Sequence, residues 1–372
     1  MRNEIFSNIS KMIERDSKVS TYKFALLRGT IDIIQDNSPF INLGQKNADI
    51  PLGLLIEKWL LYYYPILESE IFIPQINGRT ILAFEKQFRI FIIKYSELGG
   101  FSAFYNDLRL KGIPKELELE FLSLVNKIGD TIRKNPMKYI GRSFNDGFYA
   151  VFQDNNNRKK TESARIDLEF LVKKFGTFSI SLEYYSAFQI LGSFISGQDS
   201  LLFKWAEFSV KAASNGLKFE TVLNDVLRSP VTEREATKSK ILYKSILEQE
   251  GHVQCVWTMQ NINAYHIDHV IPFSIWKNND LWNLLPSSAS TNNNKRDKIP
   301  SLSLIEKRKE RIIQYWELIF ENQPERFEKE VKVSLLGSIP FDNWQYPALE
   351  RLKESCNYLI TIRGFEEWNP KM

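Results

Sequence analysis

Apolar residues recur at helical spacing along the first 150 residues of the chain. From Leu52 to Tyr63 they stand at i, i+3, i+4 and i+7, directly after Pro51, a residue suited to a first helical turn. Similar patterns run from Phe24 to Ile34 and from Leu82 to Tyr95, where a Gly-Gly pair at 99–100 ends the second one. The pattern predicts a helical N-terminal domain over residues 1–153.

A polar stretch at residues 154–163, DNNNRKKTES, indicates a domain boundary because it favours turns and has no large apolar side chain. Beyond it, residues 176–180 predict a short strand and helices continue to about residue 210, which gives a second helical region over 164–228. The basic run 158–160 and the tyrosines at 62–64 are candidate nucleic-acid contacts. A solvated loop and a buried core stripe are the more common roles of such patterns.

The last third of the chain has a different pattern. A helical repeat from Glu233 to Glu250 ends at Gly251, and residues 253–298 are then rich in Asn, Trp and Pro without a long helical period. Helical spacing resumes after Pro300 and continues to about residue 363. We therefore predict a mainly α protein with a small α+β part at residues 229–300 and a C-terminal helical extension over 301–372.

Composition narrows the class of protein. Hydrophobic residues make up 43% and charged residues 25%, as in a folded globular chain. A net charge of +4 permits an anionic partner without requiring one. The two cysteines, Cys255 and Cys356, form no Cys-x-x-Cys pair, which excludes a disulfide framework and a four-thiolate zinc site. No apolar run is long enough to span a bilayer, so we expect a cytoplasmic protein without a membrane partner.

Three short motifs lie between residues 255 and 300. The first is Asp268-His269 followed by Val-Ile-Pro, the second is Trp-Asn283-Leu, and the third is Asn292-x-x-Lys295-x-Asp. Asn283 follows His269 by 14 residues, and Asn292 follows Asn283 by 9. These motifs resemble the HNH, or ββα-metal, endonuclease superfamily. The spacing and the third-position Asn are those of the HNH domain in RNA-guided CRISPR effector nucleases.

The chemistry of these residue types suits phosphodiester hydrolysis. The reaction needs a base to deprotonate water, a cation at the developing negative charge and accurate positioning of both. The imidazole of His269 titrates near neutrality and can act as that base. Asp268 and Asn292 offer hard oxygen ligands, which suit Mg²⁺ or Mn²⁺ better than zinc.

The resemblance implies a specific role for each residue. It implies a C-terminal ββα finger flanked by helices, in which a hairpin carries Asp268 and His269 and a helix carries the third motif. His269 would be the general base, Asp268 and Asn292 the metal ligands, and Asn283 the residue that fixes the loop and orients the histidine. Lys295 would meet the scissile phosphate as a point charge.

Three departures from the family pattern affect these expectations. Many HNH proteins use two Cys-x-x-Cys pairs for a structural zinc, whereas here only Cys255 stands near a usual position, so no structural zinc is expected. Asn292 replaces the histidine of the name-giving motif. His266 is a candidate accessory residue that contacts DNA or supports the ion, with an ordinary structural histidine as the alternative.

The substrate is predicted less sharply than the reaction. DNA is the predicted partner, with RNA left open, and a basic stretch after the motif is a candidate phosphate contact or simply a solvated helix face: Arg296, Lys298, Lys307, Arg308 and Arg311. The layout resembles bacterial restriction and phage-defence nucleases. A homing or mobile-element nuclease and a catalytically silent DNA-binding or partner-sensing module are the alternatives, and a homodimer or a protein partner stays open.

Overall fold

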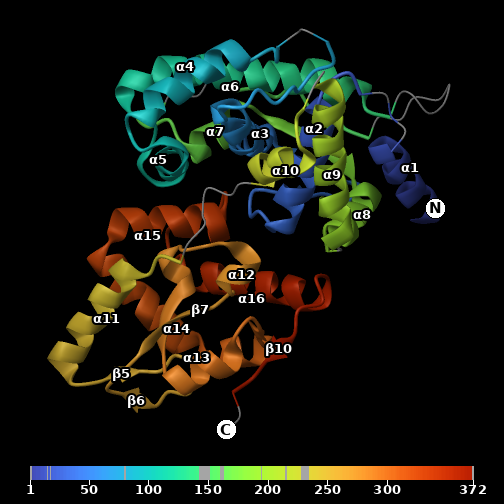
Figure 1. Cartoon of the computed structure of the whole chain (residues 1–372). Helices are drawn as coiled ribbons and strands as arrows, with labels where there is room; N and C mark the ends of the chain where they lie inside the picture. Colours follow the sequence, from blue (N-terminus) through green and yellow to red (C-terminus); the bar gives the residue numbers. More distant parts are fainter. Residues whose placement is uncertain are drawn as a thin grey trace. The chain divides into compact units, whose positions relative to one another are not determined.

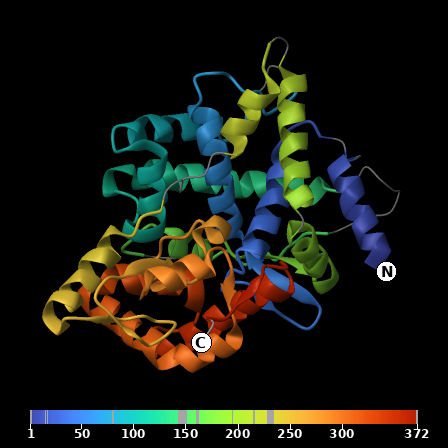
Figure 2. The same cartoon turned by 60° about the horizontal axis from the view of Figure 1, so that its bottom comes forward.

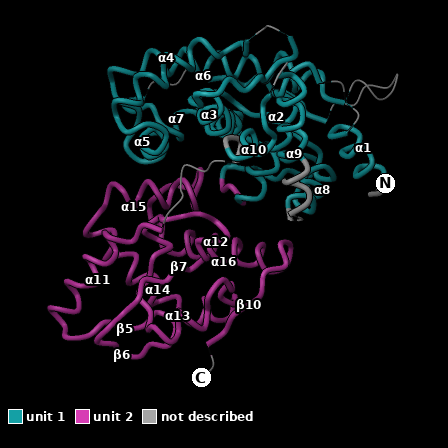
Figure 3. Tube along the Cα trace, viewed as in Figure 1, with its two compact units in different colours: residues 1–36, 40–230 teal, residues 37–39, 231–372 magenta. Residues whose placement is uncertain are grey.

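The computed structural model describes residues 2–14, 16, 18–78, 81–141, 151–159, 163–193, 195–213, 216–227 and 234–370. Contacts divide the chain into two compact units, which are shown in Figure 3. Unit 1 comprises residues 1–36 and 40–230, and unit 2 comprises residues 37–39 and 231–372. The predicted class, mainly α with a small α+β part, is confirmed.

Unit 1 is built from helices around a small antiparallel sheet (Figure 1). Its sheet has the order β1-β2-β4-β3. Its helices and strands are α1 (Arg2–Glu14), α2 (Tyr22–Gln35), β1 (Asn42–Leu43), β2 (Asn47–Pro51), α3 (Leu52–Glu68), α4 (Glu85–Ser96), α5 (Gly100–Asn106), α6 (Glu118–Ile132), β3 (Gln153–Asp154), α7 (Leu168–Lys174), β4 (Thr177–Ser181), α8 (Leu182–Ser193), α9 (Ile195–Ala212) and α10 (Phe219–Leu227). Short π-helical or 3-10 segments occupy Asp107–Lys111, Lys115–Leu117 and Arg133–Met137.

Helix α3 lies in the core of unit 1 because it is apolar on nearly every side. Gly53 allows α7 to approach closely, since a Cβ there would stand 2.3 Å from the backbone of Leu171. Tyr63 and Tyr64 are fully buried, which confirms the core alternative for the tyrosine stripe rather than a base-stacking platform. Arg158 forms an ion pair with Asp130, whereas Lys160 lies outside the described residues.

Two expectations for this unit differ from the structure. The first 150 residues contain the strands β1 and β2 besides the helices, because the short segment before Pro51 forms ladder hydrogen bonds with β4. The polar stretch at 154–163 falls inside unit 1, since β2 before it pairs with β4 after it. The regions 1–153 and 164–228 therefore share one compact unit.

Unit 2 combines helices with three short two-stranded sheets among the described residues (Figure 1). Its elements are α11 (Thr237–Glu250), β5 (Val253–Gln254), β6 (Asn261–Ile262), β7 (His266–His269), α12 (Phe273–Trp276), the 3-10 turn η4 (Leu281–Asn283), β8 (Leu284–Ser287), α13 (Ala289–Lys295), β9 (Ile299–Pro300), α14 (Leu302–Asn322), α15 (Pro324–Val331), the π-helical turn η5 (Lys332–Leu336), α16 (Gln345–Thr361) and β10 (Glu367–Trp368).

Local chemistry explains where these elements begin and end. Helix α11 ends at Gly251 in the left-handed conformation (φ 73°), as the sequence predicts. The Ser288 hydroxyl accepts from the Thr291 amide and begins α13, and Ser301 begins α14 in the same way. Strands β7 and β8 pair antiparallel and α13 follows, so residues 266–295 form a ββα arrangement.

A single apolar core joins the ββα arrangement to the C-terminal helices. The indole of Trp316 on α14 donates to the carbonyl of Trp282, and Trp257 packs edge-on against Trp368. Strand β10 pairs parallel with β9, so the C-terminal segment returns beside the ββα elements in both views (Figures 1 and 2). The predicted regions 229–300 and 301–372 therefore form one compact unit.

No helix among the described residues is long and apolar enough to cross a bilayer.

Candidate active site

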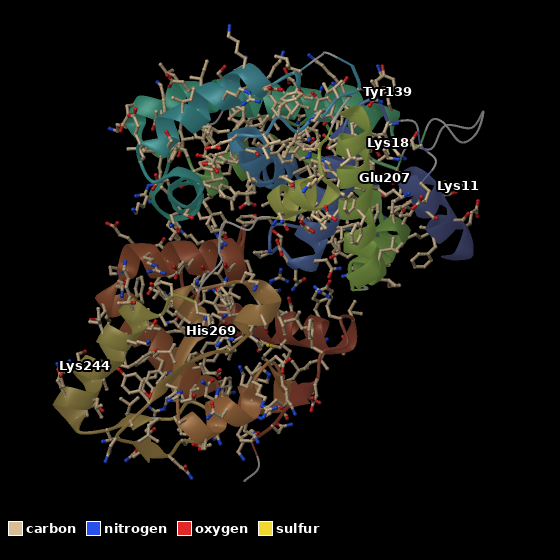
Figure 4. The ribbon with its side chains drawn as sticks, viewed as in Figure 1. Lys11, Lys18, Tyr139, Glu207, Lys244 and His269 are labelled. Carbon is tan, nitrogen blue, oxygen red and sulfur yellow. The ribbon has the colours of Figure 1, made fainter. Side chains whose placement is uncertain are left out.

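Strand β7 presents the Asp-His pair at the centre of unit 2. Its register with β8 places Asp268 opposite Leu285 and His269 opposite Leu284. Because side chains alternate along a strand, the carboxylate and the imidazole leave opposite faces of the hairpin. Both are buried, with Asp268 only 3% and His269 only 7% exposed. Figure 4 labels His269 among the strands and helices of this unit.

The carboxylate of Asp268 is held by two donors. The Trp257 indole donates to Oδ2 at 2.6 Å, and the Lys295 ammonium donates to Oδ1 at 3.0 Å. Lys295 also donates to the backbone carbonyl of His269 at 2.6 Å. A lysine on α13 therefore locks the Asp-His step of β7 in place.

This placement differs from the role expected for Lys295. The resemblance implies that its ammonium meets the scissile phosphate, yet the side chain is 0% exposed and donates to protein acceptors. The cause is the packing of α13 directly against β7, which brings the ammonium to a buried carboxylate. A phosphate contact would require this ion pair to open.

The imidazole of His269 is oriented by a residue that the motif did not include. Its Nε2 lies 3.2 Å from Oδ1 of Asn279, and the backbone amide of Glu235 donates to the same Oδ1 at 3.1 Å. A backbone N–H can only donate, so this amide fixes the Asn279 oxygen as the acceptor. His269 Nε2 must then carry a proton, which leaves the lone pair on Nδ1.

Burial lowers the pKa of His269 below its ordinary value. The hydrogen bond to Asn279 and the charge of Asp268 oppose this shift, whereas the cations of Arg234 and Lys295 add to it. A lowered pKa keeps the imidazole neutral at pH 7. A neutral ring with a free Nδ1 is the protonation state that a general base requires.

Asn283 spans the loop between β7 and β8. Its side chain is fully buried, accepts from the Ile271 amide at 2.8 Å and donates to the Ile271 carbonyl at 3.0 Å. This is the loop-fixing geometry that the resemblance implies. No hydrogen bond joins Asn283 to the imidazole among the described residues, so the orientation of His269 comes from Asn279.

The same loop is held by helix α15 and the η5 turn. Glu330 accepts from the Leu281 amide at 2.6 Å and from Arg326 at 2.6 Å. Asp280 accepts from the Ser334 hydroxyl at 2.5 Å. Burial, reinforced by the nearby Asp280 carboxylate, raises the pKa of Glu330 to about 8. Residues far beyond the motif thus fix the loop that carries Asn279.

Asn292 lies half-buried on α13, one helical turn before Lys295 and thus on the same side of the helix. Within the part of the chain that the structure describes, its side chain has no hydrogen-bond partner, so its amide oxygen is free to bind a cation. His266 is exposed on β7, on the same strand face as Asp268.

The donor set fits a hard divalent ion. A carboxylate has about four acceptor positions, and Trp257 and Lys295 use two of those on Asp268. Mg²⁺ is commonly held by one or two protein oxygens and several waters. The described residues contain no group of three or more His, Cys, Asp or Glu side chains suited to a metal. A divalent ion here would be held by Asp268 and Asn292 together with solvent.

The basic residues after the motif are partly used within the protein. Lys298 pairs with Glu366 at 2.5 Å, and Arg308 donates to the Trp257 carbonyl at 2.6 Å. Arg296 donates to the Asn293 carbonyl at 3.3 Å, and Arg311 lies over the Tyr315 ring. Lys307 is exposed. Their contact with nucleic acid stays a prediction.

Cys255 is buried in the core beside Thr291.

Comparison with known families finds one match in each unit. A model described as "Domain of unknown function (DUF8808)" matches residues 2–226. The chain belongs to the DUF8808 family. A second model, described as "HNH endonuclease", matches residues 256–301 of this DUF8808 protein. That match includes β7, β8 and α13, and it confirms the HNH-type endonuclease domain that the motifs predict.

One curated relative supports the same assignment. The CRISPR-associated endonuclease Cas9 of Listeria innocua serovar 6a (strain ATCC BAA-680 / CLIP 11262) is 26% identical to the DUF8808 protein over 100 residues. The similar region covers 26% of this chain and 7% of that relative. No solved structure matches the chain.

Sequence reasoning missed several residues of the site. Trp257, Asn279 and Glu235 bind the Asp-His pair or its partner, and Arg234 lies close enough to affect the pKa of His269. The Asn278-Asn279-Asp280 run is a polar signal within the motif region. Arg234 and Glu235 precede the HNH match and carry no such signal, because only folding brings them to the loop.

Proposed function

We propose that this protein is a divalent-metal-dependent endonuclease that hydrolyses phosphodiester bonds in DNA with His269 as the general base. The observation that carries the proposal is the geometry of His269, whose Nε2 is tied to Asn279 and whose Nδ1 therefore keeps its lone pair. The HNH endonuclease match over residues 256–301 supports the reaction class. The positive net charge of the chain is compatible with DNA.

Each residue has a distinct task in this proposal. His269 takes the proton of the attacking water at Nδ1, and Asn279 holds the ring so that the lone pair keeps its direction. Lys295 and Trp257 hold Asp268, and Asn283 holds the loop. Asp268 and Asn292 would bind Mg²⁺ or Mn²⁺. When bound, that ion supplies charge stabilisation to the leaving oxygen of the phosphodiester.

Plasmid cleavage tests the proposal. Purified protein is incubated with supercoiled, linear, single-stranded and modified DNA, and with RNA, in Mg²⁺, Mn²⁺ or EDTA. We expect nicking of supercoiled DNA that needs the divalent ion. Loss of a general base typically reduces the rate by about 10²–10⁴-fold, so His269→Ala should lose most activity.

The control for His269→Ala is His252→Ala. His252 lies outside the matched residues 256–301 and its ring contacts the Glu250 carbonyl at 3.1 Å, so its replacement should leave folding intact and preserve most of the cleavage rate. Circular dichroism verifies that both variants fold. Metal-dependent cleavage that is equal in wild type and His269→Ala would refute the proposal.

One observation favours a second candidate, a silent HNH domain that only binds nucleic acid or a partner. The Asp268 carboxylate is already neutralised by a buried lysine, which is the arrangement expected of a structural ion pair. Tight, salt-sensitive DNA binding without cleavage under any metal would support this candidate.

A role in restriction or phage defence is the biological part of the proposal. It rests on the layout of a large helical unit followed by an HNH domain. Plating efficiency of a phage panel on cells that express the wild type or His269→Ala tests it. A reduction of plaques with both proteins, or with neither, would contradict a nuclease-based defence role and leave a mobile-element nuclease to be tested by DNA mobility.

A further inference from the structure

Two cations lie close to the aromatic ring that packs against His269. The Phe273 ring contacts the imidazole edge-on, with 5.6 Å between the centroids. The Lys277 ammonium lies 5.1 Å from the Phe273 centroid, and the Arg234 guanidinium lies 5.9 Å from it. The two cations therefore lie one aromatic ring away from the proposed base.

These two cations are available to an outside anion. Both side chains are exposed, and among the described residues neither forms an ion pair with a carboxylate. The carboxylate of Glu235, next to Arg234, instead accepts from the Thr237 amide at 2.6 Å. By contrast, Lys295 and Lys298 are used by Asp268 and Glu366. Free positive charge near the imidazole is thus concentrated at Arg234 and Lys277.

The backbone holds both residues in place. Lys277 ends α12 in the left-handed conformation (φ 48°), and its amide donates to the Phe273 carbonyl at 2.9 Å. Arg234 directly precedes Glu235, whose amide is bonded to Asn279. The segment that fixes the imidazole through Asn279 therefore also carries one of the two cations. The orientation of the imidazole and the position of this cation therefore depend on the same backbone segment.

We propose that Arg234 and Lys277, which both lie over the Phe273 ring, form a phosphate-binding subsite that holds the DNA backbone beside the cleaved bond. This inference rests on the proposed nuclease function and names a site on the same strand of substrate. Nucleotides of a duplex strand are spaced about 3.4 Å along the axis. Two cations separated from the His269 imidazole by the Phe273 ring can therefore bind phosphates next to the cleaved one. Lys295 is buried against Asp268, so a phosphate contact in this region has to come from other cations.

The test measures binding, so it does not depend on cleavage. A fluorescent duplex is titrated with protein in EDTA at several KCl concentrations, for the wild type, Arg234→Gln, Lys277→Gln and the double variant. The slope of log K against log salt is negative, and each lost phosphate contact should make it less steep by about 0.9. The same relation predicts about eightfold weaker binding per contact at 0.1 M salt.

Matched controls separate charge from shape. Arg234→Lys combined with Lys277→Arg keeps both charges and should keep the wild-type slope. Lys244→Gln removes an exposed lysine of α11, which Figure 4 labels well away from His269, and should also keep it. The Gln variants remove the charge and keep a polar side chain. Both positions are exposed, so folding should be retained, which circular dichroism verifies.

The outcomes distinguish this subsite from the nuclease proposal. A double variant with the wild-type slope refutes the subsite, and so does a wild type without salt-sensitive DNA binding. A reduced slope together with a wild type that never cleaves DNA supports the subsite and refutes the nuclease. Cleavage by the wild type together with an unchanged slope in the double variant supports the nuclease and refutes the subsite.

Discussion

Replacing Lys295 by Met should destabilise unit 2 strongly. Lys295 is 0% and Asp268 3% exposed. Among the described residues, the substitution leaves that buried carboxylate with the Trp257 indole as its one remaining donor. It also removes the hydrogen bond to the His269 carbonyl. Removing one partner of a buried ion pair costs about 3–5 kcal/mol. That is a large part of the roughly 5–15 kcal/mol by which a domain is stable.

Urea unfolding followed by tryptophan fluorescence measures this loss. Unit 2 contains most of the eight tryptophans of the chain, so the signal reports mainly on it: Trp257, Trp276, Trp282, Trp316, Trp344 and Trp368. With a slope of about 1–3 kcal/mol per molar urea, a loss of about 3–5 kcal/mol should lower the midpoint by roughly 1–5 M.

The double variant Asp268→Asn with Lys295→Met provides the decisive comparison. It removes the buried charge instead of leaving it uncompensated, so it should be more stable than Lys295→Met alone. The two residues touch, so their effects should not add. The reasoning would be refuted if the unfolding free energy of Lys295→Met lay within about 0.5 kcal/mol of the wild-type value. It would also be refuted if the double variant were less stable than Lys295→Met.

Three further predictions concern the imidazole and its loop. Because burial lowers the pKa of His269, single-turnover cleavage should be independent of pH above about 7 and should fall only below the ordinary imidazole range near 6.5; a limb with its midpoint above pH 7 would contradict this. Asn279→Ala removes a hydrogen bond that raises the pKa of His269, so the acid limb of the pH–rate profile should move to lower pH. The rate should also drop about 10–100-fold. A lower rate with an unmoved acid limb would indicate a merely structural role for Asn279. Asn283→Ala leaves the buried amide and carbonyl of Ile271 without these partners and should cost about 2–4 kcal/mol in urea unfolding, with Asn293→Ala, exposed on α13, as the unaffected control.

The sequence alone determined the parts of the protein that depend on local spacing. Helical periodicity placed α3, α4, α11 and α14 close to their observed bounds, and Gly251 ended α11 as expected. The motif spacing identified the HNH domain, because the turns that join a hairpin to a helix permit few lengths. Asn283 fell in its loop-fixing position for the same reason.

Only the tertiary structure decided which groups meet. Strand β2 looked like part of a helical region, because its partner β4 lies more than a hundred residues later. The packing of α13 on β7 turned Lys295 from a predicted phosphate contact into the buried partner of Asp268. Arg234 lies near the imidazole, and the Glu235 amide binds its partner Asn279, although both residues come from a segment about 35 residues before His269. A sequence pattern records neighbours along the chain, whereas hydrogen bonds and ion pairs depend on distances that the chain acquires only when its core is packed.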